Sequence, residues 1–170
     1  MRFSRRLPGV DVRTTDSAGF VVQVQEQDFD PGQVIEDLRK RSTGAIVSFV
    51  GIARDLSGDF AVDTITLEHY PGMTERSLED LVARARARWP LLGARVIHRY
   101  GRLQPADRIV LVAVSSLHRD AAFESCRYLM DYLKTEAPFW KREAGAGGER
   151  WVDAKASDEQ ALARWQPDAT

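Results

Sequence analysis

The order of apolar patterns along the chain predicts a mixed α+β fold. Segments that alternate between apolar and polar residues, as strands do, interleave with segments whose apolar residues recur every three or four positions, as on one face of a helix. Several neighbouring strands are joined by short turns, so hairpins are prominent. With 170 residues, 44% of them hydrophobic, the chain is long enough to form one domain with a substantial core.

The first strand and the first helix are expected near the beginning of this domain. The segment 20–25, FVVQVQ, alternates apolar and polar residues and is predicted to be a strand. The segment 30–44 carries helix signals: Asp30 can cap its start, Pro31 suits its first turn, and Gln33 can complete a capping box. The glycine at its end is expected to terminate it.

A strand, a turn, a second strand and a helix follow. The segment 45–54 is rich in β-branched and aromatic residues and is expected to be a central strand. After turn-forming residues, the alternating segment 62–70 is expected to be a second strand, in an antiparallel arrangement. Thr74 is expected to cap the next helix, and Pro90 to end it.

The second half of the chain repeats this mixture. Strands are expected at 94–101 and 107–116, and a helix at 118–137. Pro138 forces the preceding residue out of the helical region, so the residues that follow are expected to be extended. A glycine-rich turn at 145–148 is then expected to fold the chain back into a last strand, which completes a hairpin.

The ends of the chain carry weaker patterns. Residues 1–19 are expected to be a poorly ordered or strand-forming leader, because no apolar stretch of the kind found in signal peptides follows their arginines. Residues 20–158 are expected to form a single domain, and residues 159–170 a C-terminal tail.

Composition excludes several classes of function. The formal net charge is -1, so no global positive field is available to attract nucleic acid. No apolar run approaches the roughly 20 residues of a membrane-spanning helix. Cys126 is the single cysteine, which excludes an internal disulfide and a cysteine-based zinc site and favours the cytoplasm. Its place on the apolar face of a predicted helix indicates a core position.

Cationic side chains are the main candidates for chemistry. His118 and Arg119 lie where a strand passes into a helix, and a helix start beside an arginine can hold a phosphate. An ordinary solvated loop explains the same pair equally well. Arg54 lies at the end of a strand predicted to be buried, and a solvated strand end explains it as readily.

Two lysines flank Pro138. Lys134 lies in the last turn of the predicted helix, where the helix dipole favours a cation. Lys141 lies in the extended segment after the proline. A chain that turns at Pro138 can bring Lys141 back beside the end of the helix, and two neighbouring ammonium groups attract an anion. A lysine in such a place can act as acid, base or nucleophile.

Five segments between residues 49 and 143 occur together in one order: FVGIAR, LEHYPGMTE, VIHRYG, HRDAAFE and DYLKTEAPFWKRE. This combination resembles the family of molybdopterin synthase catalytic (large) subunits. The resemblance implies an α/β hammerhead fold with an additional antiparallel β subdomain, which agrees with the α+β prediction. It also makes residues 20–158 the catalytic domain.

The resemblance implies a reaction and its partners. The family installs two sulfur atoms in cyclic pyranopterin monophosphate and so forms the dithiolene of molybdopterin, a step of molybdenum cofactor biosynthesis. The sulfur arrives as a thiocarboxylate on the C-terminal Gly-Gly of a small ubiquitin-like subunit. Two large subunits form a homodimer with one small subunit at each far end, which makes a heterotetramer. The step requires no metal and no cofactor.

The resemblance also assigns roles to particular residues. It makes Lys134 and Lys141 catalytic and substrate-binding, with Lys134 nearest the thiocarboxylate tail and Lys141 facing the pterin. Arg54, His118 and Arg119 are expected to bind the substrate anion. The resemblance leaves open whether His118 and Arg119 act in their own subunit or in the neighbouring one.

Arg142 and Glu143 lie in the same motif and are expected to contribute to substrate binding. Two positions depart from some family members, because Ile52 stands where they have a basic residue and Lys155 where they have an arginine. Each departure is expected to weaken one anion contact without removing an essential residue.

Two other classes of function remain open on the residues alone. A lyase that forms a Schiff base between a lysine and a phosphorylated carbonyl compound would use the same cations, and borohydride trapping distinguishes it. A non-catalytic module that binds nucleic acid or a ubiquitin-like tail is the second alternative. Near-neutral charge and few aromatic residues on the expected surface argue against nucleic acid.

Overall fold

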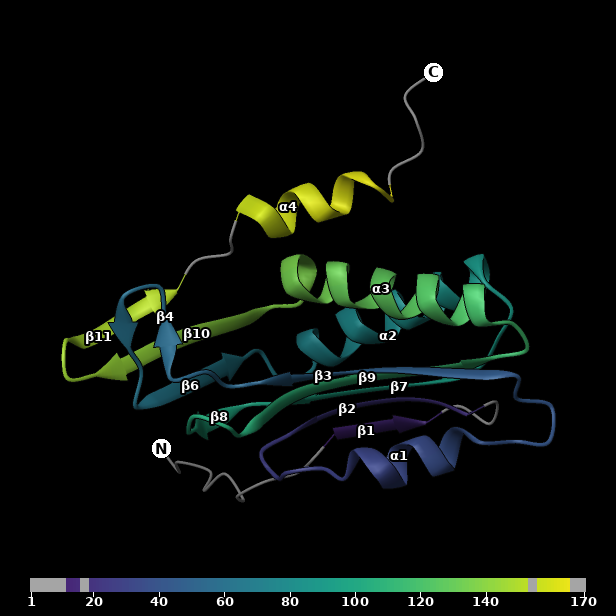
Figure 1. Cartoon of the computed structure of the whole chain (residues 1–170), viewed down its shortest axis with the longest axis horizontal. Coiled ribbons are helices and arrows are strands. Elements are labelled where there is room, and N and C mark those ends of the chain that lie inside the picture. The colour runs from purple at the N-terminus through teal and green to yellow at the C-terminus, as the bar shows by residue number, and fades with distance from the viewer. Residues whose placement is uncertain (1–11, 16–18, 153–155, 166–170) are drawn as a thin grey trace, which may run out of the picture.

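A five-stranded sheet forms the centre of the molecule (Figure 1). The computed structural model describes residues 12–15, 19–152 and 156–165. The strands follow one another across the sheet in the order β1 (Val12–Thr15), β2 (Phe20–Gln25), β7 (Leu91–Arg99), β9 (Arg108–Ser116) and β3 (Ala45–Ile52). The β2–β7 pair is parallel and the other neighbours are antiparallel.

Helices cover both faces of this sheet (Figure 1). They are α1 (Pro31–Leu38) on one face and, on the other, α2 (Met73–Arg88) and α3 (Arg119–Glu136); α4 (Ala156–Ala163) packs on α3, on the side away from the sheet. Strand alternation divides the core between the two faces. Val112 and Val114 of β9 pack in the cluster that holds the buried side chains of α2 and α3, whereas Leu111 and Ala113 pack with those of α1.

A second, four-stranded sheet lies at one end of the molecule, at the left of Figure 1. Its order is β11 (Gly148–Val152), β10 (Phe139–Gly145), β6 (Thr64–His69) and β8 (Gly101–Leu103), with every pair antiparallel. The short hairpin of β4 (Leu56–Ser57) and β5 (Phe60–Ala61) lies beside it. The α+β fold with an additional antiparallel sheet is therefore confirmed.

The predicted position of one strand is wrong. The segment 45–54 was predicted to be a central strand, but β3 is the edge strand of the larger sheet, and its Phe49 and Ile52 are 40% and 47% exposed. The segment 62–70 forms an antiparallel strand, as predicted, and its neighbours are β10 and β8 in the second sheet. Apolar composition reports how much surface must leave water, and it does not specify which neighbour covers that surface.

The first helix is shorter than predicted. It starts as expected, with the Asp30 carboxylate accepting from the N–H groups of Gly32 and Gln33, but the Gln33 side chain donates to Asp37, so the predicted capping box does not form. It ends at Leu38 and not at residue 44.

A local turn competes with the continuation of this helix. The Thr43 hydroxyl accepts from the Lys40 N–H and donates to the Leu38 carbonyl. Gly44 has another role than helix termination, because a Cβ there would lie 2.0 Å from the carbonyl oxygen of Leu117. The glycine therefore permits a close approach between two chain segments.

The cap of α2 also differs from the prediction. The cap residue is Gly72, with φ of 84°, and the Glu75 carboxylate accepts from the Gly72 N–H. Thr74 is buried inside the first turn instead. Its hydroxyl accepts from the Tyr70 N–H and donates to the Pro138 carbonyl, which joins α2 to the residue before β10.

The sequence patterns missed α4. Trp165, just beyond this helix, is buried edge-on against Trp89 and Tyr128, and its indole N–H donates to the Asp131 carboxylate at 2.8 Å. The leader contains the strand β1, while residues 153–155, with Lys155, and residues 166–170 lie outside the described residues. No helix in the described ranges is long and apolar enough to cross a membrane.

Candidate active site

The candidate site begins where α3 passes into β10. Lys134 lies in the last turn of α3, which ends at Glu136. Ala137 is extended, Pro138 follows it, and β10 starts at Phe139, so the predicted break at the proline is confirmed. The two lysines therefore lie on different elements, on either side of a joint of two residues.

Buried groups from distant segments hold this joint. The Thr74 hydroxyl donates to the Pro138 carbonyl at 3.4 Å, and the ring of Phe139 stacks on the ring of His98 with 3.6 Å between centroids. His98 donates from Nδ1 to the Arg99 carbonyl, and burial lowers the pKa of its imidazole to about 4. His98 is thus a neutral residue packed against Phe139.

Lys141 is held by a buried carboxylate. Its ammonium lies 2.8 Å from Oε1 of Glu143, which is 1% exposed, while the Lys141 side chain is 35% exposed. The guanidinium of Arg150 lies 3.0 Å from the other oxygen, Oε2. Burial raises the pKa of the Glu143 carboxyl, but hydrogen bonds from Lys141, Arg150 and Ser57 outweigh burial and lower that pKa. Glu143 is therefore an anion that faces cations and not solvent.

The hairpin of β4 and β5 packs against this group. Arg150 donates to the Ser57 carbonyl at 2.8 Å, and its guanidinium lies 4.4 Å from the centre of the Phe60 ring. Gly145 permits the approach, because a Cβ there would lie 2.0 Å from the Ala61 carbonyl oxygen. Arg54 leads into the same hairpin. Its side chain is exposed and has no ion-pair partner within the described ranges.

Arg142 lies on the opposite face of β10 from Lys141 and Glu143, as strand alternation requires. Its guanidinium pairs with Glu149 at 2.8 Å and lies 5.7 Å from the centre of the Trp151 ring. The structure therefore separates Arg142 from the group around Lys141.

His118 and Arg119 lie at the other end of α3. His118 is the N-terminal cap, and both side chains are exposed, with Arg119 paired to Asp120 at 3.3 Å. Sixteen residues separate His118 from Lys134, which corresponds to roughly 24 Å along a helix. Within one chain, the structure does not bring this pair together with the lysines.

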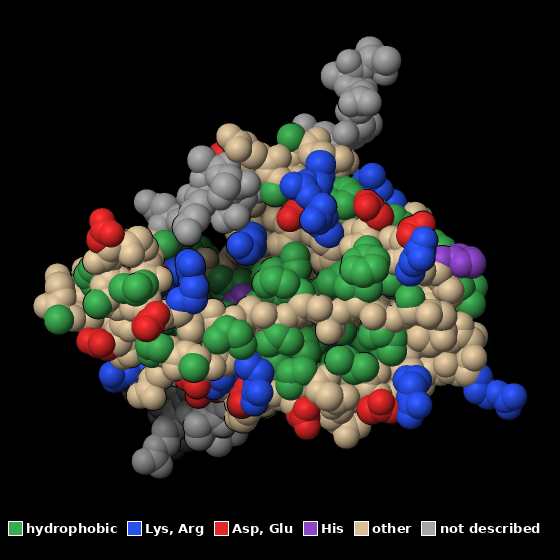
Figure 2. All heavy atoms as spheres, in the orientation of Figure 1, with side chains coloured by type: hydrophobic (Ala, Val, Ile, Leu, Met, Phe, Trp, Pro, Cys, Tyr) green, Lys and Arg blue, Asp and Glu red, His purple; other side chains and the backbone are tan. Residues whose placement is uncertain are grey.

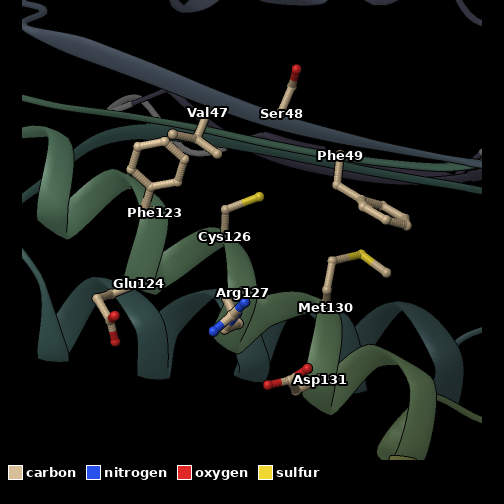
Figure 3. Close-up of a pocket in the computed structure, with 9 residues that line it drawn as sticks. All are labelled: Val47, Ser48, Phe49, Phe123, Glu124, Cys126, Arg127, Met130 and Asp131. Atoms are coloured by element: carbon tan, nitrogen blue, oxygen red, sulfur yellow. The ribbon is translucent and has the colours of Figure 1, made fainter.

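An apolar groove of about 500 Å³ runs between β3 and α3 (Figure 3). Its lining comprises Val47, Ser48, Phe49, Phe123, Glu124, Cys126, Arg127, Met130 and Asp131. None of the predicted site residues lines it. Cys126 is 4% exposed, as predicted for a core residue, and burial raises the pKa of its thiol to about 11. Figure 2 shows hydrophobic side chains gathered along this face.

Sequence reasoning missed three residues that shape the site. Arg150 neutralises Glu143, and Thr74 and His98 hold the joint before β10. A signal for Arg150 existed: in a hairpin closed by the glycine-rich turn, its position can fall directly opposite Glu143, on one face with Lys141. Thr74 and His98 have no comparable local signal.

The chain is similar to proteins of one family. A family model described as MoaE protein matches residues 24–136, a range that holds Arg54, His118, Arg119 and Lys134. A molybdopterin synthase catalytic subunit from Ralstonia nicotianae is 55% identical over 146 residues, covering 85% of this chain and 83% of that protein. One from Escherichia coli is 51% identical over 145 residues, covering 85% of this chain and 97% of that protein.

Solved structures agree with this similarity. The molybdopterin biosynthesis MoaE protein from Burkholderia ambifaria has a TM-score of 0.73 and 49% identity, with 86% of this chain and 97% of that chain covered. The resemblance drawn from the sequence motifs is therefore confirmed. This chain belongs to the MoaE protein family.

Proposed function

We propose that this chain is the catalytic subunit of a molybdopterin synthase. It transfers sulfur from the thiocarboxylated C-terminus of a small partner subunit to cyclic pyranopterin monophosphate and so forms the molybdopterin dithiolene. The observation that carries the proposal is the placement of Lys134 and Lys141 on either side of one joint, in a MoaE-family chain. Relatives about half identical in sequence carry the name of this catalytic subunit.

The charges of the site suit this reaction. The substrate phosphate and the partner thiocarboxylate are both anions, and fixed cations stabilise the charge that develops when sulfur attacks and the cyclic phosphate opens. Lys141 has three N–H donors, of which Glu143 needs one. In this proposal the remaining donors of Lys141 face the pterin, and Lys134 meets the partner tail. One of the two lysines supplies the proton that the leaving oxygen takes up.

Other predicted residues then take supporting roles. Arg54, exposed beside the β4–β5 hairpin, binds the substrate anion. Glu143 holds Lys141 in place and does not itself touch the substrate, because its carboxylate is buried against two cations. Arg142 stays outside the proposed pocket, since it lies on the opposite face of β10.

His118 and Arg119 reach a pocket of this kind most simply as residues of a second copy. They lie roughly 24 Å from Lys134 within their own chain. A homodimer whose interface covers the apolar groove between β3 and α3 would bury the exposed Phe49 and Phe123. In that arrangement each copy supplies His118 and Arg119 to its neighbour's lysines. The buried free Cys126 fits the cytoplasm as the compartment.

The decisive experiment is reconstitution with the precursor and the thiocarboxylated small subunit of the same organism. We expect dithiolene formation with the thiocarboxylate and none with the same subunit ending in an ordinary carboxylate. A pull-down with this subunit is expected to capture the chain, and its loss on removal of the terminal Gly-Gly is the matched control. Absence of both product and capture would refute the proposal. Borohydride capture of substrate on a lysine would instead support the lyase alternative.

A further inference from the structure

Arg150 and Lys141 bind the same carboxylate, that of Glu143, so Arg150 can affect the position of Lys141 without contacting it. Arg150 lies on β11 directly opposite Glu143 of β10. Its Nε and Nη2 approach Oε2 of the carboxylate at 3.2 and 3.0 Å, while Lys141 approaches Oε1 at 2.8 Å. Each oxygen of the buried carboxylate thus has a cation of its own.

A second set of contacts fixes Arg150 itself. Nη2 also donates to the Ser57 carbonyl of β4 at 2.8 Å, and the guanidinium lies 4.4 Å from the centre of the Phe60 ring of β5. The planar guanidinium presents its donors in a rigid fork, so these contacts define one orientation. Through Arg150, the β4–β5 hairpin is connected to the carboxylate that holds Lys141.

We propose that Arg150 is a positioning residue for Lys141 and acts through Glu143. The inference rests on the proposed function, in which Lys141 acts on the pterin. Arg150 covers Oε2 and donates two charge-assisted hydrogen bonds to it, so its loss removes both bonds from an oxygen that is otherwise buried. Without Arg150, the carboxylate turns to offer both oxygens to Lys141, and the ammonium moves away from the position in which its free donors face the substrate.

The test is a kinetic comparison in the reconstituted synthase. Arg150→Met keeps the length of the side chain and removes its donors. We expect kcat to fall about 10- to 100-fold, the scale of a small misplacement of a catalytic group, while KM for the pterin changes little. Arg150→Lys restores a charge but not the fork, so it is expected to recover part of the loss.

A double-mutant cycle with Glu143→Gln isolates the path of the effect. If Arg150 acts through the carboxylate, Arg150→Met should change kcat by less than about twofold in the Glu143→Gln background. Arg102→Met is the matched control, because Arg102 lies on β8 of the same sheet, is exposed and donates to Thr64. It should leave kcat unchanged. Circular dichroism and thermal unfolding establish that each variant is folded.

Several outcomes would overturn the inference. They are an unchanged kcat in folded Arg150→Met, a rise in KM alone, or an equal loss with and without the Glu143→Gln substitution. If Arg150→Met does not fold, Arg150→Lys carries the same cycle, with a severalfold loss expected when Glu143 is present and none in the Glu143→Gln background. The wild-type enzyme separates the two proposals: an inactive wild type refutes the proposed function, whereas an active wild type with an insensitive Arg150 refutes only this inference.

Discussion

At its C-terminal end, α3 runs into β10 across two residues, and Thr74, His98 and Glu143 fix the segment on which Lys141 lies. At its N-terminal end, His118 and Arg119 project into solvent, and Arg119 pairs with its sequence neighbour Asp120. The two ends of one helix thus differ in how firmly their cations are held.

This difference concerns the side-chain entropy that each cation must still lose before it can bind an anion. An exposed arginine must lose side-chain entropy before it holds an anion in one geometry. Lys141 has already lost much of this freedom, because its ammonium is bound to a buried carboxylate. The cation of Lys141, near the C-terminal end of α3, is therefore held in place, whereas those of His118 and Arg119 are exposed at the N-terminal end.

The largest expected effect comes from removing the cations near the C-terminal end of α3. Lys134→Ala and Lys141→Ala should each lower the rate of dithiolene formation about 10²- to 10⁴-fold, the range for loss of a general acid or base, while the fold stays intact. Product formation in the reconstituted enzyme measures the rate, and circular dichroism shows whether the fold is intact. Full activity of both folded variants would show that the lysines at the C-terminal end of α3 do not carry the reaction.

Acidification should lower the stability of the folded chain through His98, which packs at the joint before β10. The pKa of His98 is lowered to about 4 in the folded chain from an ordinary 6.5, so below pH 6.5 the unfolded chain binds a proton that the folded chain does not. Stability from this group is complete above pH 6.5 and is lost as the pH falls towards 4, by about 3 kcal/mol.

Denaturant unfolding at pH 7 and pH 5 measures this dependence. In His98→Phe, which retains an aromatic ring against Phe139, the difference between the two pH values should shrink. The remaining difference belongs to other groups, including His69, whose pKa is lowered by burial. An identical pH dependence in the variant and the wild type would contradict the assignment to His98.

A smaller effect is expected from Thr74→Val. The substitution keeps the shape of the side chain and removes the hydrogen bonds to Tyr70 and Pro138, so unfolding should become easier by about 1–2 kcal/mol. Thermal unfolding measures this change. Thr43→Val is a control in which a half-buried hydroxyl in a turn loses its hydrogen bonds, and it should cost less because Thr74 is fully buried. A larger loss from Thr43→Val would show that Thr74 does not hold the joint.

Mixed dimers test whether His118, at the N-terminal end of α3, acts in its own chain or in the neighbouring one. Chains with Lys141→Ala and chains with His118→Ala, coexpressed, should assemble at random and recover about a quarter of the wild-type sites if His118 acts across a two-fold interface. One site of each mixed dimer then carries both defects and the other carries neither. If His118 acts in its own chain, no mixture recovers activity. Equal expression of both chains and the activity of each pure variant are the controls.

Local rules were sufficient for part of the site. The break at Pro138 follows from backbone sterics, and alternation along β10 puts Lys141 and Glu143 on one face and Arg142 on the other. These features depend on a few consecutive residues, so a sequence pattern contains them. The mixed fold was predictable for the same reason.

The remaining features depend on which distant segments meet. The pairing of Glu143 with Arg150 needs the hairpin register that sets Gly145 opposite Gly148, and periodicity alone does not specify a register. The edge position of β3 depends on strand order, and a strand rich in β-branched residues looks alike at the edge and in the centre. The roles of Thr74 and His98 need contacts that no local pattern records.

The joint before β10 also bears on the order of folding. Thr74 and Pro138 are 64 residues apart in the chain, and contacts of this kind are made only after a large loop has closed. The stacking of Phe139 on His98 likewise requires β7 to be in place. The two lysines therefore reach their final relative positions late, and the proposed anion site is not assembled in a nascent or partly folded chain.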